Sequence, residues 1–414
     1  VETPTGLFEG SQVVAGTNLN QATASPFQWS SSDFNASYFS HSTSTNSHQV
    51  TVLKAGDYKL TLTLPVFSTG QRPVIVSSIR VNGVAIGRGL SESSYIRNQN
   101  GHQESSNHFD VLLTDLAVND VIVVTMERGT STTTAVTSPG GRLAIEYIHA
   151  SREIFMGTAT ESVLGTNLNS SSESPLKWTQ VKIDSEFTHN NGANPQNILL
   201  TSGGSYFISV NSPLERDGAC ADSNDRTSVQ LKVKVNGSVV QGGVGSQAYM
   251  RCFSGHEHSS AHFVGMIHSV SPNSTLTIDV VGETDDFVAV KTQSSMFADM
   301  YIEKVDTNHG LASLSAVNPS SGTNWNASTS GLDLNWDQQS TIDSSFYTHS
   351  TTTNSHQITF AKSGDYLLFY NDHLDKTSSS RTNVRVRLLV NGSAETSAQC
   401  LTHYARDTQS HDES

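Results

Sequence analysis

The stretch "HSTSTNSHQV" at residues 41–50 decides the fold of this chain, because it returns at residues 349–358 as "HSTTTNSHQI". Ser for Thr and Val for Ile are the exchanges between the two copies. A more distant copy, "HNNGANPQNI", occupies residues 189–198. Each copy opens with a histidine, so the histidines belong either to a repeated site or to a repeated loop.

Three further anchors accompany these stretches in the same order. A Trp precedes each stretch, a Gly-x-Tyr follows it and an Asn-Gly pair comes later; they are Trp29, Trp178 and Trp336, then Tyr58, Tyr206 and Tyr366, then Asn82–Gly83, Asn236–Gly237 and Asn391–Gly392. The opening histidines lie 148 and 160 residues apart, whereas solenoid units span about 20–50 residues. Each unit is therefore a whole domain. We predict repeat 1 at 1–152, repeat 2 at 153–306 and repeat 3 at 307–414.

Repeat 3 is predicted to be incomplete at its C-terminal end. The segments "HFDVLLTDLAVNDVIVVTMER" and "GRLAIEYI" of repeat 1 have no counterpart in it, so about three strands are missing. A sheet without its last strands exposes edges and half of a core. The sequence leaves two explanations open: either it is a fragment of a longer chain, or strands of a neighbouring subunit complete the repeat.

The composition and patterning indicate an all-β protein with little or no helix. Charged residues make up 15% of the chain and hydrophobic residues 35%, and short alternating apolar runs are separated by Gly, Asn and Ser. In residues 50–64, Val50 and Val52 and then Tyr58, Leu60 and Leu62 alternate with other residues, as in a half-buried strand pair. About eight to ten strands per unit predict tandem antiparallel β-sandwich, or jelly-roll, domains.

Charge and hydropathy exclude several classes of function. The net charge is −14 and no basic stripe appears, which argues against a nucleic-acid partner. No apolar run reaches the roughly 18 residues that a membrane span needs. The chain begins without Met, as a processed protein does. Six Asn-x-Ser/Thr sequons are candidate glycosylation sites in an exported protein: Asn35, Asn169, Asn236, Asn273, Asn326 and Asn391.

The strand pattern resembles the globular head of complement component C-one-q, within the tumour-necrosis-factor-like jelly-roll superfamily. The matching features are Gly56, Tyr58, Asn82–Gly83 and Asn119–Asp120, with the segments 50–64 and 108–126 around them. The resemblance covers repeats 1 and 2 and most of repeat 3. It implies a ten-stranded jelly roll and an extracellular binding or scaffolding role. Relatives assemble as trimers; three units in one chain either argue against that assembly here or imitate the trimer within one chain.

A repeated polar cluster is the strongest candidate site. The pattern is Tyr-x-Arg, then four residues, then His-x-Glu/His, and it occurs three times. The copies are Tyr95, Arg97, His102 and Glu104, then Tyr249, Arg251, His256 and His258, then Tyr404, Arg406, His411 and Glu413. His108 and His262 follow in the first two copies. Alternate residues of a strand share one face, so His102, Glu104 and His108, or His256, His258 and His262, would suit Zn²⁺. A structural network is the favoured interpretation, and an interface or ligand role stays open beside the metal.

Other constellations carry weaker signals. The opening histidines favour a structural Ser/Thr/Asn loop over a metal or ligand role, because repeat 2 has Gln196 where the other copies have His48 and His356. Cys220 and Cys252 are predicted to form a disulfide, which leaves Cys400 over. The acidic loop at 214–226 offers a calcium site through Asp217, Asp222 and Asp225. No nucleophile elbow and no phosphate loop occur, so we expect no enzyme and no required cofactor.

These observations favour an extracellular or cell-surface structural protein, such as a surface-layer, fibre or filament subunit, that associates with itself or with neighbouring subunits. The alternative is a glycan-binding adhesin or lectin-type module, for which Trp325 and Trp336 are candidate stacking surfaces.

Overall fold

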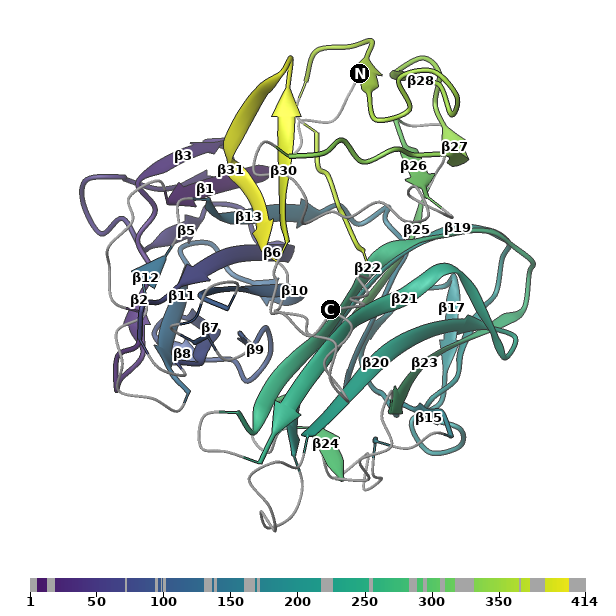
Figure 1. Ribbon diagram of the computed structural model, residues 1–414, viewed down its shortest axis with the longest axis horizontal. Helices are drawn as coiled ribbons and strands as arrows, with labels where there is room; N and C mark the ends of the chain where they lie inside the picture. Colours follow the sequence, from purple (N-terminus) through teal and green to yellow (C-terminus); the bar gives the residue numbers. More distant parts are fainter. Residues whose placement is uncertain are drawn as a thin grey trace.

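The computed structural model describes most of the chain. The described residues are 6–12, 19–70, 73–93, 96–97, 99, 102–129, 136–137, 140–159, 168–169, 172–216, 226–252, 256–282, 289–292, 296–305, 310–316, 331–364, 366–372 and 384–401. All of their regular secondary structure is β, which confirms the predicted all-β class (Figure 1). No helix among these residues is long and apolar enough to cross a membrane.

Repeat 1 forms a sandwich of two antiparallel sheets. The inner sheet has the order β10–β6–β13–β1–β3 with β12 beside β6, and its strands are β1 (Leu7–Gln12), β3 (Ser31–Phe34), β6 (Gly56–Phe67), β10 (Glu104–Leu116), β12 (Val136–Thr137) and β13 (Gly141–Ile148). The outer sheet has the order β4–β5–β11–β7–β8, with β2 beside β11 and β9 beside β7. Its strands are β2 (Ser25–Pro26), β4 (Phe39–Ser40), β5 (Val50–Val52), β7 (Ile75–Val81), β8 (Val84–Ala85), β9 (Ser91–Glu92) and β11 (Val121–Arg128).

Repeat 2 has the same strand order. Its inner sheet runs β16–β14–β25–β19–β22 with β24 beside β19, from β14 (Ile154–Ala159), β16 (Thr179–Ile183), β19 (Gly204–Arg216), β22 (His258–Val270), β24 (Val290–Thr292) and β25 (Ala298–Val305). Its outer sheet runs β17–β18–β23–β20–β21 with β15 beside β23. These strands are β15 (Ser174–Pro175), β17 (Phe187–His189), β18 (Ile198–Leu200), β20 (Arg226–Val235), β21 (Ser238–Arg251) and β23 (Ser274–Gly282).

The anchors of the repeat fill equivalent places in the two cores. Trp29 and Trp178 are fully buried, and so are Tyr58 and Tyr206. The Tyr58 hydroxyl donates to the carbonyl of Lys54, and the equivalent bond of Tyr206 measures 2.5 Å. Alternation of apolar residues on β6 and β19 therefore places one face of each inner sheet against its own outer sheet.

The Asn-Gly pairs form the predicted hairpin turns. Asn82 and Asn236 have φ of 51° and 52°, and the glycine that follows each also has a positive φ. This left-handed backbone matches the twist of a two-residue hairpin, and Asn and Gly adopt it with little strain. The asparagine side chains also support the turns, since Asn82 Nδ2 donates to Asp120 Oδ1 over 2.7 Å.

Repeat 3 differs from the other two, because its described strands form three separate two-stranded sheets. They are β26 (Ala312–Ser315) with β27 (Gln338–Ile342), β28 (Tyr347–His349) with β29 (Ile358–Phe360), and β30 (Arg385–Val390) with β31 (Ser393–Leu401). Strands β5, β7 and β1 of repeat 1 are the counterparts of β29, β30 and β26. In repeat 1, β11 lies between β5 and β7, and β13 lies between β1 and β6. Apolar side chains of the described strands of repeat 3, such as Phe360 and Leu389, are exposed.

The three repeats lie around a common centre (Figure 1), and equivalent surfaces meet at successive contacts. Asn211 Nδ2 of repeat 2 donates to the Leu90 carbonyl of repeat 1 over 2.6 Å. Asn371 Nδ2 of repeat 3 donates to the Val244 carbonyl of repeat 2 over 3.0 Å. Asn211 and Asn371 each follow the anchor tyrosine by five residues, so the two hydrogen bonds are equivalent.

The third contact closes the ring. Strand β31 of repeat 3 packs against β6 and β10 of repeat 1, just as β9 of repeat 1 packs against β19 and β22 of repeat 2. Head-to-tail contacts of this kind generate a ring when the rotation closes. The chain thus has a pseudo-threefold arrangement. The limits predicted for the three repeats stay predictions.

Candidate functional site

The opening histidines hold a loop in all three repeats. Their Nε2 atoms donate to a backbone carbonyl six residues further on, at 3.0, 2.9 and 3.1 Å for His41, His189 and His349. The same three carbonyls accept the backbone N–H of the anchor Trp29, Trp178 and Trp336. The favoured structural interpretation thus agrees with the geometry, and the loop ties the start of one strand to the tryptophan before it.

The first histidine of the Tyr-x-Arg cluster is buried in both complete repeats. His102 is 1% exposed and His256 is 2% exposed. Each lies in an equivalent turn, in which the backbone N–H of Arg97 or Arg251 donates to the histidine carbonyl over 2.7 Å. Tyr95 and the whole third copy (Tyr404, Arg406, His411 and Glu413) lie outside the described residues.

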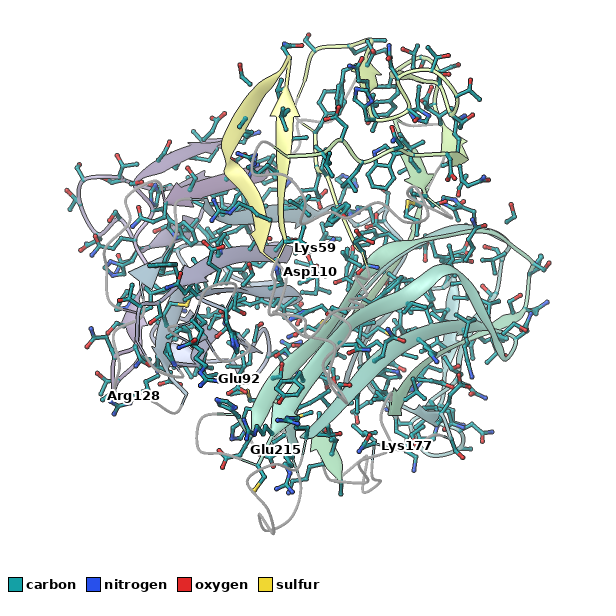
Figure 2. The ribbon with its side chains drawn as sticks, viewed as in Figure 1. Lys59, Glu92, Asp110, Arg128, Lys177 and Glu215 are labelled. Atoms are coloured by element: carbon teal, nitrogen blue, oxygen red, sulfur yellow. The ribbon has the colours of Figure 1, made fainter. Side chains whose placement is uncertain are left out.

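The next position of the cluster reaches into a neighbouring repeat. Arg385 of repeat 3 donates to Glu104 Oε1 over 2.5 Å. At the equivalent place in repeat 2, His258 Nδ1 lies 3.9 Å from Glu92 of repeat 1 and 3.8 Å from Glu215. Glu92 is 2% exposed, and its carboxylate and that of Glu215 both lie beside His258 at the boundary between the two repeats (Figure 2). Burial lowers the pKa of His258.

The last histidines of the cluster meet at the same boundary. The rings of His108 and His262 lie edge to face with centroids 5.7 Å apart. His108 also lies 3.3 Å from the hydroxyl of Thr63. Burial between the repeats lowers the pKa of His108 to about 4, although Asp110 opposes the shift. A neutral His108 at pH 7 packs there without a buried charge.

The structure does not bring these histidines and Glu104 together as a ligand set. Among the described residues, no group of three His, Cys, Asp or Glu side chains is placed to hold a metal ion. His102 and His256 lie in turns of their own repeats, whereas Glu104 contacts Arg385 of repeat 3. His258 lies beside Glu92 of repeat 1, and the rings of His108 and His262 contact each other. The predicted zinc site therefore finds no support in the described residues. The predicted calcium ligands Asp217, Asp222 and Asp225 lie outside them.

Cys252 is buried and disulfide-bonded. Its predicted partner Cys220 lies outside the described residues, so the Cys220–Cys252 pairing stays a prediction. Among the sequons, Asn236, Asn273 and Asn391 are exposed at turns, Asn35 is half-buried, Asn169 is buried, and Asn326 is not described. Trp325 is also not described, and Trp336 packs edge to face on Tyr370.

A buried lysine lies where the three repeats meet. Lys59 of β6 is 3% exposed, and its Nζ lies 4.0 Å from the ring centre of Phe207, 4.9 Å from that of Tyr301 and 4.7 Å from that of Phe369. Phe207 and Tyr301 belong to repeat 2 and Phe369 belongs to repeat 3. Burial lowers the pKa of Lys59, and the Asp110, Glu146 and Glu303 carboxylates oppose that shift.

The Asp110 carboxylate lies near Lys59 and favours its charged form. It accepts hydrogen bonds from the hydroxyl of Thr61 and, over 2.8 Å, from that of Ser209. Thr61 and Ser209 occupy equivalent places in repeats 1 and 2. Figure 2 shows Lys59 and Asp110 close together at the centre of the molecule. A cation–π contact that is shielded from water contributes about 2 kcal/mol or more.

Sequence reasoning missed Lys59, although a signal was available. A charged residue occupies a strand position where repeats 2 and 3 have Phe207 and Leu367. A lysine is almost never fully buried without partners. A lysine at a strand position that is apolar in the other repeats therefore predicts partners from outside its own repeat.

A groove of about 800 Å³ crosses the outer sheet of repeat 1. Its floor includes Val123 and Thr125 of β11, which are buried, and its sides include His48, Arg80 and Glu127. In repeat 2 the places of Arg80 and Thr125 are taken by Lys234 and Asp279. There the Lys234 ammonium lies between Glu173 and Asp279, 3.0 Å from the latter. Repeat 1 has Ala24 where repeat 2 has Glu173, so Arg80 has no equivalent of the ion pair between Lys234 and Glu173.

Comparisons with known proteins add a limited amount. No family model and no curated protein matches this chain. Among solved structures, murine APRIL at pH 8.0 is 9% identical, with 37% of this chain and 100% of that chain covered and a TM-score of 0.26. PNGF-II is 10% identical over 74% of this chain and 66% of that chain, with a TM-score of 0.26. A Paenibacillus xanthan lyase is 11% identical over 62% of this chain and 22% of that chain, with a TM-score of 0.19. These values are too low to assign a family or a function.

Proposed function

We propose that this protein is an extracellular structural or assembly protein, which works as a rigid three-part head and not as an enzyme. One observation carries the proposal: in repeats 1 and 2, where the Tyr-x-Arg cluster is described, several of its side chains lie at the boundaries between repeats. Glu104 contacts Arg385 of repeat 3, His258 lies beside Glu92 of repeat 1, and His108 stacks on His262. Such a cluster serves assembly, because equivalent positions of repeats 1 and 2 each contact a neighbouring repeat.

Membership of the complement C-one-q and tumour-necrosis-factor-like superfamily forms part of this proposal. Three features support it: the Gly-x-Tyr and Asn-Gly motifs, the two-sheet sandwich of repeats 1 and 2, and the head-to-tail ring of three repeats. Under this proposal the chain performs alone what three chains perform in a trimer.

An extracellular location is supported by the disulfide at Cys252, because oxidising compartments favour such bonds. The exposed sequons Asn236, Asn273 and Asn391 at hairpin turns are accessible to glycosylation.

Self-association is supported by the surface of repeat 3. Phe360, Leu368 and Leu389 are 43%, 51% and 53% exposed. Exposed apolar side chains that cluster on one domain mark interaction surfaces or aggregation-prone faces. A neighbouring subunit that covers these side chains would bury apolar area worth about 25 cal/mol per Å².

Sedimentation velocity and negative-stain microscopy of the purified whole chain test the proposal. We expect the sedimentation coefficient to rise with concentration, and regular filaments or layers in the images. A matched variant, Leu368→Ser with Leu389→Ser, should lower the assembled fraction because it removes exposed apolar contacts. A chain that stays monomeric at every concentration, or one that turns over a substrate, would contradict the proposal.

A further inference from the structure

We propose that the repeat 1 groove binds a saccharide that carries a carboxylate, with Arg80 as the residue that contacts the acid group. This inference goes beyond the proposed assembly function, because the groove lies on the outer sheet of repeat 1 and the contacts between repeats involve other surfaces. The volume of about 800 Å³ falls within the range of small-molecule sites.

The charge on Arg80 is the first argument. Its Nη1 donates to the Gly83 carbonyl over 2.9 Å, and no carboxylate among the described residues forms an ion pair with it. In repeat 2 the equivalent Lys234 has two carboxylate partners, Glu173 and Asp279. Arg80 therefore retains N–H donors in a planar fork, and a carboxylate is the group that such a fork binds in two parallel hydrogen bonds.

The other polar side chains define the rest of the ligand. Glu127 lies two residues beyond Thr125 on β11, on the same face of the sheet as the groove floor. Its carboxylate accepts hydrogen bonds from hydroxyl groups and repels a second acid. Gln49 and His48 offer further donors and acceptors on the opposite side. One acid group together with several hydroxyls is the composition of a sugar acid.

The strand pairing disfavours an extended peptide. Such a peptide adds to a free strand edge through its backbone. Strand β11 below the groove already pairs with β7 on one side and with β5 and β2 on the other. The floor of the groove therefore offers side chains, and both edges of β11 are already paired. A polyanion such as nucleic acid is also disfavoured, because Glu127 lines the groove and the chain carries a net charge of −14.

Ligand-observed saturation-transfer NMR with the whole chain tests the inference with two matched sugars. The probe is cellobiouronic acid, and the control is cellobiose, which has a hydroxymethyl group in place of the carboxylate. We expect saturable binding of the acid with a Kd on the order of 1 mM, typical of a small polar ligand in an open groove. Cellobiose should bind at least about 10-fold more weakly, since it cannot pair with Arg80.

Substitutions in the groove test whether Arg80 contacts the carboxylate of the sugar. Arg80→Ala should weaken binding at least about 10-fold, and Arg80→Lys should keep part of it, because lysine retains the charge and loses the fork. Lys234→Ala in repeat 2 is the matched control and should leave binding unchanged. Ala24→Glu with Thr125→Asp introduces the two carboxylates of repeat 2 and should abolish binding. If that double variant does not fold, Arg80→Ala and Arg80→Lys still test whether Arg80 contacts the acid group.

Three kinds of result would overturn the inference. The first is equal binding of cellobiose and its acid, which removes the role of the carboxylate. The second is unchanged binding in Arg80→Ala, or an absence of saturable binding by the unaltered chain. The third is equally tight binding of acetyl-Gly-Asp amide, which carries one carboxylate on a peptide and would show that the groove recognises an acid without a sugar.

Discussion

Leu60 of repeat 1 and Leu368 of repeat 3 hold the same place in their repeats, two residues after the anchor tyrosine. Leu60 is fully buried, whereas 51% of Leu368 is exposed. The local sequence around both is similar, so the difference comes from the neighbours of each segment. In repeat 1, β6 lies between β10 and β13. The comparison teaches that a strand with a correct alternating pattern gains stability only when its neighbours cover it.

The largest expected effect concerns the repeats in isolation. Residues 307–414 alone should show no cooperative unfolding transition, because their described strands form pairs without a shared core and two-stranded sheets are marginal in water. Residues 153–306 alone should unfold cooperatively, since their core is closed. Thermal melts followed by circular dichroism measure both. A cooperative transition from a monomeric 307–414 would break the comparison.

Truncation of the paired leucines should give the next largest effect. Leu60→Ala should cost about 2–5 kcal/mol in the free energy of unfolding of repeat 1, because it leaves a cavity in a packed core. Leu368→Ala should cost less than about 1 kcal/mol, because the side chain is half exposed in the folded chain. Hydrogen-exchange mass spectrometry on peptides from 56–67 and 366–372 reports each region separately. Similar losses of protection at the two sites would contradict the comparison.

The free energy of unfolding should depend on pH through Asp299, which is buried at the boundary between repeats 1 and 2. Asp299 is 1% exposed and accepts the Gly89 N–H over 2.8 Å, and burial raises its pKa to about 7. The folded state then binds more protons than the unfolded state between about pH 4 and 7, so this group lowers stability as the pH rises through that window.

Asp299→Asn keeps the acceptor and removes the charge. We expect the variant to match the unaltered chain at pH 3.5 and to be more stable at pH 8, by up to about 4 kcal/mol. Urea unfolding at the two pH values gives the difference. Equal stability of the two proteins at pH 8 would show that Asp299 does not titrate in this range.

The smallest expected effect concerns the boundary between repeats 3 and 1. The side chains of Arg385 and Glu104 are 45% and 20% exposed. Arg385→Ala should therefore cost only about 0.2–1 kcal/mol, and the cost should shrink in high salt. Urea unfolding at low and high ionic strength measures it. A cost of several kcal/mol would mean that repeat 3 is held to the ring as firmly as repeat 2.

The sequence by itself determined the all-β class, the three-fold repetition of the motifs and the main strands of repeat 1. Period-two alternation around Tyr58 and Tyr206, and Asn-Gly pairs at the turns, are local signals, because backbone conformation and side-chain direction follow from neighbouring residues. The structural role of His41 was also predictable, since repeat 2 keeps this histidine as His189 while it replaces His48 by Gln196.

Only the tertiary structure decided what the shared polar cluster does. The spacing of His102, Glu104 and His108 suggested one face and one ligand set. Glu104 instead contacts repeat 3 and His108 contacts repeat 2, because the ring of repeats places other surfaces against that strand. The cage around Lys59 likewise draws on Phe207 and Phe369 from the other two repeats. Such contacts depend on how whole domains are positioned, and this information is not local to any stretch of the sequence.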